Sequence, residues 1–309
     1  AKEAVRAETI NSLEVVGREW IEKNKGAWTL DHGKRILARL EKNIFPFLGG
    51  KAVDDIKAPE LLDALRRIES RDAVYTAHRT LQTCGQIFRY AVATGRAERD
   101  ISSDLKGALA PAKEVHFASI TEPKAVGDLL RTINTYWGHP RIGIALRLAP
   151  YLLVRPGELR KAEWAEIDLD AAEWRIPASR MKMRVMHIVP LAGQVIKLLE
   201  LLQQDTGSGR FLFPSFRAAS APISDATLLA ALRNLGYSKD QMTVHGFRSM
   251  ASTILNEQGY NRDWIERQLA HAESNSVRAA YNYAEYLPER RQMMQEWADY
   301  LDKLRENKD

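Results

Sequence analysis

The stretch between Thr243 and Tyr286 constrains this chain most, because it alternates short helical runs with side chains that can do chemistry. His245 and Arg248 are three residues apart, so at the start of a helix they project from one face. Apolar residues continue at helical spacing behind them as far as Gly259, and they would anchor that face against a core. The pattern therefore predicts a helix that presents an imidazole and a guanidinium together.

The rest of the same stretch adds a second imidazole and a phenol. Another helical run leads to His271, and Ser274 stands where it can cap a third helix. In that helix Tyr281 shares an apolar stripe and can face inward, whereas Tyr283 points about 200° away at about 100° per residue. Short turns bring the four groups close, and such groups could hold a phosphodiester and attack it.

Length, charge and cysteine content bound the class of protein. A chain of 309 residues predicts about two domains, and a net charge of +5 favours an anionic partner. The single cysteine, Cys84, excludes an internal disulfide and fits a reducing cytoplasm. No apolar run is long enough to span a bilayer, and no secretory signal opens the chain, so no membrane partner is expected.

The helical patterns predict two domains and two flanking segments. Residues 10–109 are expected to form an all-helical domain, and 110–120, which include Pro111, a linker. Residues 121–309 are expected to form the second domain, which ends in a helix whose apolar stripe either covers its own core or docks on a neighbouring subunit. Residues 1–9 look like a linker helix from a missing N-terminal domain.

Basic residues occupy polar positions of the last helix in the first domain, expected over residues 73–94. They include His78, Arg79 and Arg89. Such residues are commonly a solvated face, and they are also what a DNA-binding surface needs. Both interpretations stay open from the sequence.

In the second domain an apolar helix over 142–153 is interrupted by Arg155-Pro-Gly-Glu158. An arginine directly after an apolar run lies at the edge of a core and needs an anionic partner. Glu158 could be that partner in a buried ion pair. Alternatively, Arg155 faces a ligand and Glu158 helps to orient it.

A basic hairpin follows, and it belongs to a small antiparallel sheet in an otherwise α-helical fold. Its tip carries Lys182 with Arg180 and Arg184 beside it. Charges at a tip commonly protect a sheet edge, but a nucleic-acid backbone would also bind them. Three strands are expected, and they cover 164–169, 174–176 and 186–189.

The reactive groups indicate phosphoryl transfer without a metal. Nucleases that rely on Mg²⁺ need several converging carboxylates, and the nearest candidate, Asp168-Leu-Asp170, is more simply a turn. Without metals, the charge of a pentacoordinate phosphate must be met by guanidinium groups, here those of Arg155 and Arg248. No metal or cofactor is therefore expected.

A tyrosine nucleophile starts from a pKa of about 10, so it needs nearby cations and a proton acceptor. For Tyr281 the expected acceptor is His245, with His271 donating a hydrogen bond to a phosphate oxygen. Lys182 could protonate the leaving 5′-oxygen. A phosphotyrosine link keeps the strand activated, so a 5′-hydroxyl from another strand can reseal it.

The motifs, taken in order, resemble those of the tyrosine recombinases, and most of all the integrases of prophages and genomic islands in enterobacteria. They are Arg155-Pro-Gly-Glu158, Lys182 in its hairpin, His245-Gly-Phe-Arg248, Leu269-Ala-His271 and Ala280-Tyr281-Asn282. By this resemblance the catalytic positions are Arg155, Lys182, His245, Arg248, His271 and Tyr281, with Glu158 as the accessory acid.

The resemblance implies a helical, SAM-like core-binding domain in the first hundred residues and a catalytic domain in the remainder. It implies a site-specific recombinase that integrates or excises a prophage or genomic island through a 3′-phosphotyrosine intermediate. The implied partners are double-stranded attachment sites, three further copies in a homotetramer at the synapse, an excisionase and a DNA-bending protein. The implied location is the nucleoid in the bacterial cytoplasm, and the implied missing segment is an N-terminal arm-binding domain.

Two other functions are compatible with the same residues. A type IB topoisomerase shares the chemistry, but the integrase-like residues near both termini argue against it. A non-catalytic DNA-binding regulator could keep the fold, but the retention of all six motif residues argues against that. One departure from the family is Val185-Met186, where relatives often carry Arg-Pro, and it could alter the stiffness of the hairpin.

Overall fold

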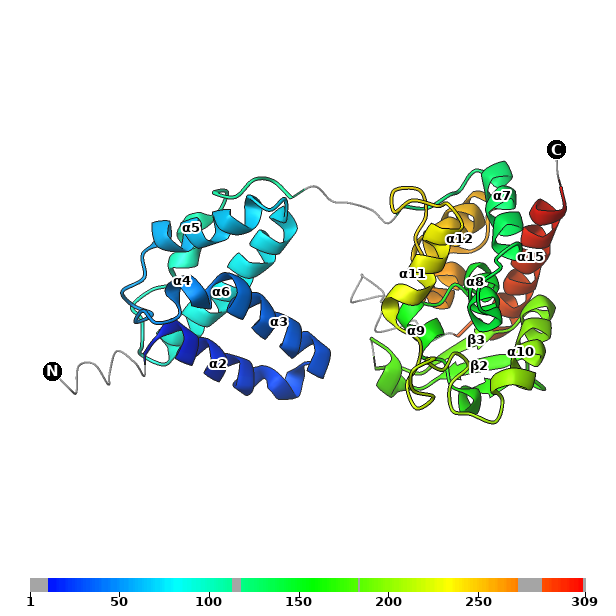
Figure 1. The fold of residues 1–309 in the computed structure, drawn as a ribbon, viewed down its shortest axis with the longest axis horizontal. Coiled ribbons are helices and arrows are strands. Elements are labelled where there is room, and N and C mark those ends of the chain that lie inside the picture. The colour runs from blue at the N-terminus through cyan, green and yellow to red at the C-terminus, as the bar shows by residue number, and fades with distance from the viewer. Residues whose placement is uncertain (1–10, 113–117, 183, 272–284, 308–309) are drawn as a thin grey trace. The chain divides into compact units, whose positions relative to one another are not determined.

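The computed structural model describes residues 11–112, 118–182, 184–271 and 285–307. The chain divides into two compact units, Ala1–Val115 and His116–Asp309 (Figure 1). Each unit has its own hydrophobic core. The predicted fold class, mainly helical with one small antiparallel sheet, is confirmed. None of the described helices is long and apolar enough to cross a membrane.

The first unit is helical over its described residues, and its helix starts follow local rules. Ser12 Oγ accepts the N–H of Val15 at 3.4 Å, and Thr29 Oγ1 accepts the N–H of His32 at 3.3 Å. The helix expected over 73–94 is confirmed, and the apolar faces of all the helices meet in one core. The helices are α2 (Leu13–Asn24), α3 (Leu30–Asn43), α4 (Phe45–Leu48), α5 (Ala58–Glu69) and α6 (Val74–Ala93), with short 3-10 turns at Lys25–Ala27 and Ile101–Leu105.

Helix α8 lies at the centre of the second unit, where several other helices pack around it (Figure 1). It ends at Leu152, just before Arg155, as the apolar pattern predicts. Leu153 then takes a left-handed φ of 57°, which turns the chain into the next helix. The helices are α7 (Pro123–Asn134), α8 (Pro140–Leu152), α9 (Pro156–Arg160), α10 (Gly193–Thr206), α11 (Asp225–Asn234), α12 (Gly246–Glu257), α13 (Arg262–Gln268) and α15 (Leu287–Glu306).

The sheet has the order β1-β2-β3 and is antiparallel, and the predicted β2–β3 hairpin is confirmed. The expected strand over 164–169 is wrong in its first half, because Trp164–Glu166 forms a 3-10 turn. The N–H of Trp164 donates to the carbonyl of Arg210 at 3.0 Å, and pairing with β2 starts only at Ile167. The strands are β1 (Ile167–Asp168), β2 (Glu173–Ile176) and β3 (His187–Pro190).

The final helix, α15, covers the core of its own unit. Trp297 and Leu301 on its apolar stripe are fully buried. The indole N–H of Trp297 donates to the carbonyl of Pro150 in α8 at 2.9 Å. The sequence leaves open whether this stripe covers its own core or docks on a neighbouring subunit. In the structure it covers its own core.

Candidate active site

Arg155 directly precedes helix α9, and Glu158 lies one turn later within it. The Glu158 carboxylate accepts the backbone N–H of Arg155 through Oε2 and Nη1 of the guanidinium through Oε1, both at 2.8 Å. Nη2 donates to the carbonyl of Ala270 at 2.8 Å. Glu158 is buried, whereas the Arg155 side chain is 24% exposed. The ion pair is therefore present, and it orients a guanidinium that still reaches the surface. That Arg155 faces a ligand stays a prediction.

Arg248 lies in the first turn of α12 and is 4% exposed. Its guanidinium donates to two backbone carbonyls at helix ends, those of Leu153 and, at 2.7 Å, Leu269. Nη2 also lies 3.2 Å from Nε2 of His271. Burial, followed by the nearby charge of Arg155, lowers the pKa of Arg248 to about 10. The group is therefore still charged at neutral pH, although it is buried beside another cation.

His271 follows α13 by a tight turn, in which Ala270 has a left-handed φ of 48°. Its backbone N–H donates to the carbonyl of Glu266 at 3.1 Å. Its ring Nδ1 lies 2.8 Å from Oε2 of the same Glu266. The turn and this contact direct the other ring nitrogen toward Arg248.

His245 is half-buried directly before α12. Burial lowers its pKa, and the charges of Arg248, Arg155 and His271 lower it further. An imidazole with a lowered pKa is neutral at physiological pH and can accept a proton. The structure therefore brings four of the predicted residues into one electrostatic cluster, with Glu158 beneath them.

The turn that starts α12 is fixed by the chain just after the boundary between the units. A Cβ on Gly246 would lie 2.3 Å from the carbonyl oxygen of Ala118, so only glycine fits there. Ser119 Oγ donates to the Gly246 carbonyl at 2.9 Å, and the Gly246 N–H donates to Thr243 Oγ1 at 2.9 Å. These contacts determine where the side chains at the helix start lie.

The three basic residues at the tip of the β2–β3 hairpin differ in their surroundings. Lys182 and Arg184 are exposed, but the Arg180 side chain is only 16% exposed and forms an ion pair with Glu166. Its Nη2 also donates to the carbonyl of Glu158 at 3.0 Å. The guanidinium is therefore engaged within the protein, where it supports the backbone of Glu158. A DNA contact at Arg180 stays a prediction.

Two parts of the predicted site are not joined to the cluster. Within the described ranges, no hydrogen bond or ion pair links Lys182 to the clustered residues, so its role stays a prediction. Tyr281 lies outside the described residues, as do Ser274, Tyr283 and most of the segment for which a third helix is predicted. The nucleophile is therefore a prediction from the sequence.

In the first unit, each of the three expected DNA contacts already has a protein partner. Nε2 of His78 lies 2.8 Å from the carbonyl oxygen of Ala110. Arg89 forms an ion pair with Asp100 at 2.8 Å, with its own side chain 60% exposed. These contacts suit a solvated face as well as a DNA-binding one, so both roles stay predictions.

The third expected contact, Arg79, stands in more basic surroundings. Its guanidinium lies over the exposed ring of Tyr75 and donates to the phenol oxygen at 2.9 Å. Burial and then the charge of Arg79 lower the pKa of Arg39 in the neighbouring helix α3. The sequence does not indicate Arg39, because its proximity to α6 depends on how the two helices pack.

A buried polar network beneath the site also has no sequence signal. Arg290 is fully buried, and it donates to Gln268 Oε1 at 2.8 Å, to the carbonyl of Ile188 at 2.5 Å and to that of Glu285 at 3.2 Å. His187 Nε2 lies 3.1 Å from the carbonyl oxygen of Gln268. Burial, and then the charge of Arg290, lowers the pKa of His187 to about 3, so its ring is neutral. The network joins α13, β3 and α15.

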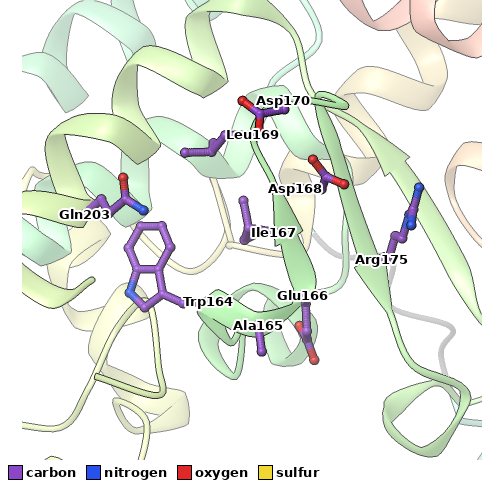
Figure 2. Close-up of a pocket in the computed structure, with 9 residues that line it drawn as sticks. All are labelled: Trp164, Ala165, Glu166, Ile167, Asp168, Leu169, Asp170, Arg175 and Gln203. Carbon is purple, nitrogen blue, oxygen red and sulfur yellow. The ribbon is translucent and has the colours of Figure 1, made fainter. Parts of the chain in front are cut away.

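An open pocket beside β1 shares no residue with the cluster (Figure 2). Figure 2 shows the carboxylates of Glu166, Asp168 and Asp170 along its lining. Asp168 Oδ1 accepts the N–H of Ala171 at 2.8 Å, which makes this stretch a turn, as predicted. Carboxylates repel phosphates, so this pocket is a poor match for DNA.

Comparisons with known proteins agree with this geometry. Residues 13–108 match the model of the phage integrase central domain, and residues 120–287 match that of the phage integrase family. An integrase of Enterobacteria phage P4 is 40% identical over 94% of this chain and 69% of its own length. An integrase of Shigella phage Sf6 is 35% identical over 94% of this chain and 76% of its own.

Among solved structures, a lambda integrase tetramer bound to a Holliday junction matches the fold with a TM-score of 0.68, at 18% identity. That match covers 86% of this chain and 79% of the other. At this identity the likeness concerns the fold alone. The family models and the relatives show the class of protein. The chain belongs to the phage integrase family, the tyrosine recombinases. It is an integrase, an enzyme of site-specific recombination, and the topoisomerase and regulator alternatives are not favoured.

Proposed function

We propose that the cluster around Arg248 binds the scissile phosphodiester of an attachment site, and that Tyr281 attacks it. The observation that carries the proposal is the crowding of like charges. Arg248 is buried, and two basic side chains lie beside it. The charge of Arg155 lowers its pKa, and Nε2 of His271 lies 3.2 Å from its Nη2.

The two carboxylates of the cluster are engaged by other groups, Glu158 by Arg155 and Glu266 by His271. Arg248 itself donates to neutral carbonyls, and burying a cation without an anion in direct contact is costly. A phosphate supplies that anion, and guanidinium groups match its oxygens.

The chemical step follows from the position and charge of each group. The Tyr281 oxygen forms a bond to phosphorus while the bond from phosphorus to the 5′-oxygen breaks. The phenol proton passes to His245, which is neutral because its pKa is lowered. Lys182 on the hairpin supplies the proton that the 5′-oxygen needs. Arg155 and Arg248 stabilise the extra negative charge of the transition state.

The product of this step is a 3′-phosphotyrosine and a free 5′-hydroxyl. The bond energy of the broken linkage is kept in the new ester, so the reverse reaction with a 5′-hydroxyl of another strand rejoins DNA. Glu158 contributes by holding the Arg155 guanidinium at its carboxylate. No step requires a metal ion or a cofactor.

The likeness to DNA-bound integrases supports proposals about partners. The lambda structures hold a core site in one case and a Holliday junction in the other. We propose that this chain likewise binds double-stranded attachment sites and acts as a homotetramer, with an excisionase and a DNA-bending protein as accessory partners. Residues 10–109 would be the core-binding domain, 110–120 the linker and 121–309 the catalytic domain. The place of action would be the nucleoid in the bacterial cytoplasm.

A suicide duplex tests the proposed chemistry. A candidate core site carries a nick near the cleavage position, so that the short 5′-hydroxyl fragment diffuses away and traps the covalent complex. Wild-type chain, Tyr281→Phe and the matched control Tyr283→Phe are incubated with it in EDTA and separated on a denaturing gel. We expect a covalent band with wild type and Tyr283→Phe, and none with Tyr281→Phe. A band that needs a divalent metal, or that survives in Tyr281→Phe, would overturn the proposal.

A further inference from the structure

Glu266 is a carboxylate that the motif residues do not include, yet it contacts one of them directly. We propose that Glu266 is a positioning residue, which fixes a proton on Nδ1 of His271 and thereby aims Nε2 at the scissile phosphate. The inference rests on the proposed role of His271 in phosphate binding. The inference makes a side chain of helix α13 part of the proposed phosphate-binding site.

Two contacts hold His271 to Glu266 at once. The ring Nδ1 lies 2.8 Å from Oε2, and the backbone N–H of His271 donates to the Glu266 carbonyl at 3.1 Å. Between them Ala270 takes a left-handed φ of 48°, and its carbonyl accepts from Arg155 Nη2 at 2.8 Å. The Nδ1 side of the ring is therefore held by Glu266, and the turn that precedes His271 is hydrogen-bonded to Arg155.

The carboxylate decides where the ring proton lies. An ionised carboxylate can only accept hydrogen bonds, so Nδ1 must carry the hydrogen. Nε2 then becomes the nitrogen on the site side, 3.2 Å from Nη2 of Arg248. In the neutral ring Nε2 accepts from Arg248. Donation from Nε2 to a phosphate oxygen requires a hydrogen on that nitrogen as well, and the Glu266 carboxylate would then compensate the charge of the imidazolium.

Electrostatics extends the role of Glu266 beyond its direct partner. Burial and the charge of Arg155 lower the pKa of Arg248, and the carboxylates of Glu158 and Glu266 oppose that lowering. The two carboxylates therefore have parallel roles. Glu158 accepts a hydrogen bond from the guanidinium of Arg155, and Glu266 contacts Nδ1 of His271, the ring nitrogen that points away from Arg248.

The competing explanation is an ordinary surface ion pair. The side chains of Glu266 and His271 are 40% and 45% exposed, and pairs of this kind commonly contribute little. That explanation predicts that replacing Glu266 affects cleavage to the same small extent whether or not His271 is present. Positioning predicts an effect that exists only through the imidazole.

A double-mutant cycle separates the two explanations. The rate of covalent complex formation on the suicide duplex is measured for Glu266→Ala, His271→Ala and the double variant. We expect Glu266→Ala to lower the rate about 10-fold, as is typical when an orienting partner of a histidine is lost, and to add nothing in the His271→Ala background. Glu266→Gln should recover most of the rate, because its amide oxygen still accepts from Nδ1. The matched control is Glu200→Ala, an exposed carboxylate on α10.

An equal effect in both backgrounds, or no effect of Glu266→Ala, would overturn the positioning role. A second measurement needs no DNA and therefore stands apart from the proposed function. Nitrogen NMR of histidine-labelled chain, assigned by loss of a signal in His271→Ala, reports which ring nitrogen carries the proton. We expect Nδ1 in wild type and in Glu266→Gln, and a change in Glu266→Ala. A neutral wild-type ring protonated at Nε2 would contradict the inference even if the covalent complex forms.

Discussion

Two buried arginines in the second unit, Arg290 and Arg248, have similar burial and different surroundings. They are 0% and 4% exposed, and burial lowers the pKa of each to about 10. Arg290 donates to the Gln268 side chain and to two backbone carbonyls, and its hydrogen bonds hold together elements far apart in sequence. Arg248 also donates to two carbonyls, but its neighbours are Arg155 and the imidazole of His271. The nearby carboxylates, Glu158 and Glu266, are in contact with those two neighbours.

The difference shows how a structural charge can be told from a functional one. A buried guanidinium whose charge and donors are met within the protein stabilises the fold and needs no ligand. For Arg290 the partners are Gln268, two backbone carbonyls and the carboxylate of Glu285 at 4.0 Å. A buried guanidinium that is crowded by other basic groups lowers the stability of the free protein and favours the binding of an anion. Substitutions at the two positions should therefore fail in different ways.

The largest effect is expected for Arg290→Ala. It leaves the Gln268 side-chain oxygen and two carbonyls without their donor, so we expect the free energy of unfolding to fall by about 3–5 kcal/mol. The measurement is urea unfolding followed by circular dichroism. The matched control is Arg305→Ala on the same helix, whose guanidinium pairs at the surface with Asp302 and should cost about 1 kcal/mol or less. Equal losses in the two variants would remove the distinction.

Arg248→Ala should show the opposite profile. We expect the rate of covalent complex formation to fall by about 10²- to 10³-fold, because a guanidinium that meets transition-state charge is lost. The loss of unfolding free energy should be smaller than for Arg290→Ala, because repulsion from Arg155 is relieved as two hydrogen bonds are lost. If Arg248→Ala formed the covalent complex at the wild-type rate and lost as much unfolding free energy as Arg290→Ala, Arg248 would be a structural arginine like Arg290.

Acid should destabilise the network around Arg290 through His187. The folded pKa of His187, about 3, lies below the ordinary value of 6.5, so below that ordinary value the unfolded chain binds a proton that the folded chain excludes. The contribution to stability is therefore lost as pH falls from 6.5 toward 3. Between pH 7 and pH 5 the loss amounts to about 2 kcal/mol. Urea unfolding at pH 7 and pH 5 measures the fall in unfolding free energy between the two. That fall should be smaller in His187→Gln than in wild type by this amount, and equal falls would contradict the lowered pKa of His187.

The smallest effect is expected on the titration of His245. Burial and then the charge of Arg248 lower its pKa, so Arg248→Ala should move that pKa part of the way back up. NMR titration of the ring signals measures the shift. Arg305→Ala serves as the control and should leave the His245 titration as in wild type. An unchanged value in Arg248→Ala would mean that the two groups are not electrostatically coupled.

The sequence predicts those parts of the site that depend on local geometry. Three-residue spacing places His245 and Arg248 together at the start of a helix, and the structure has both at the start of α12. The break after an apolar helix similarly places Arg155 and Glu158 at the edge of the core. In each case the side chains are brought together by one turn of backbone, so the pattern along the chain suffices.

Contacts that depend on packing could not be predicted in this way. Arg290 and Gln268 are 22 residues apart in sequence, and they meet only because α15 folds onto α13. Arg180 lies near the tip of a hairpin, a position that is typical of exposed residues, but an ion pair with Glu166 in the neighbouring 3-10 turn buries most of its side chain. Glu266 is five residues before its partner, a spacing that leaves a regular helix face and works only through the left-handed turn between them.

The most direct test of the central claim is to locate the atom of the protein that DNA becomes attached to. The covalent complex formed in EDTA is digested with nuclease and trypsin and analysed by mass spectrometry. Cleavage after Arg278 and Arg290 releases one peptide that contains Tyr281, Tyr283 and Tyr286, so fragmentation within it locates the nucleotide. We expect the added mass on Tyr281. A nucleotide on either of the other two tyrosines, or on a residue outside this peptide, would contradict the claim that the cationic cluster serves Tyr281.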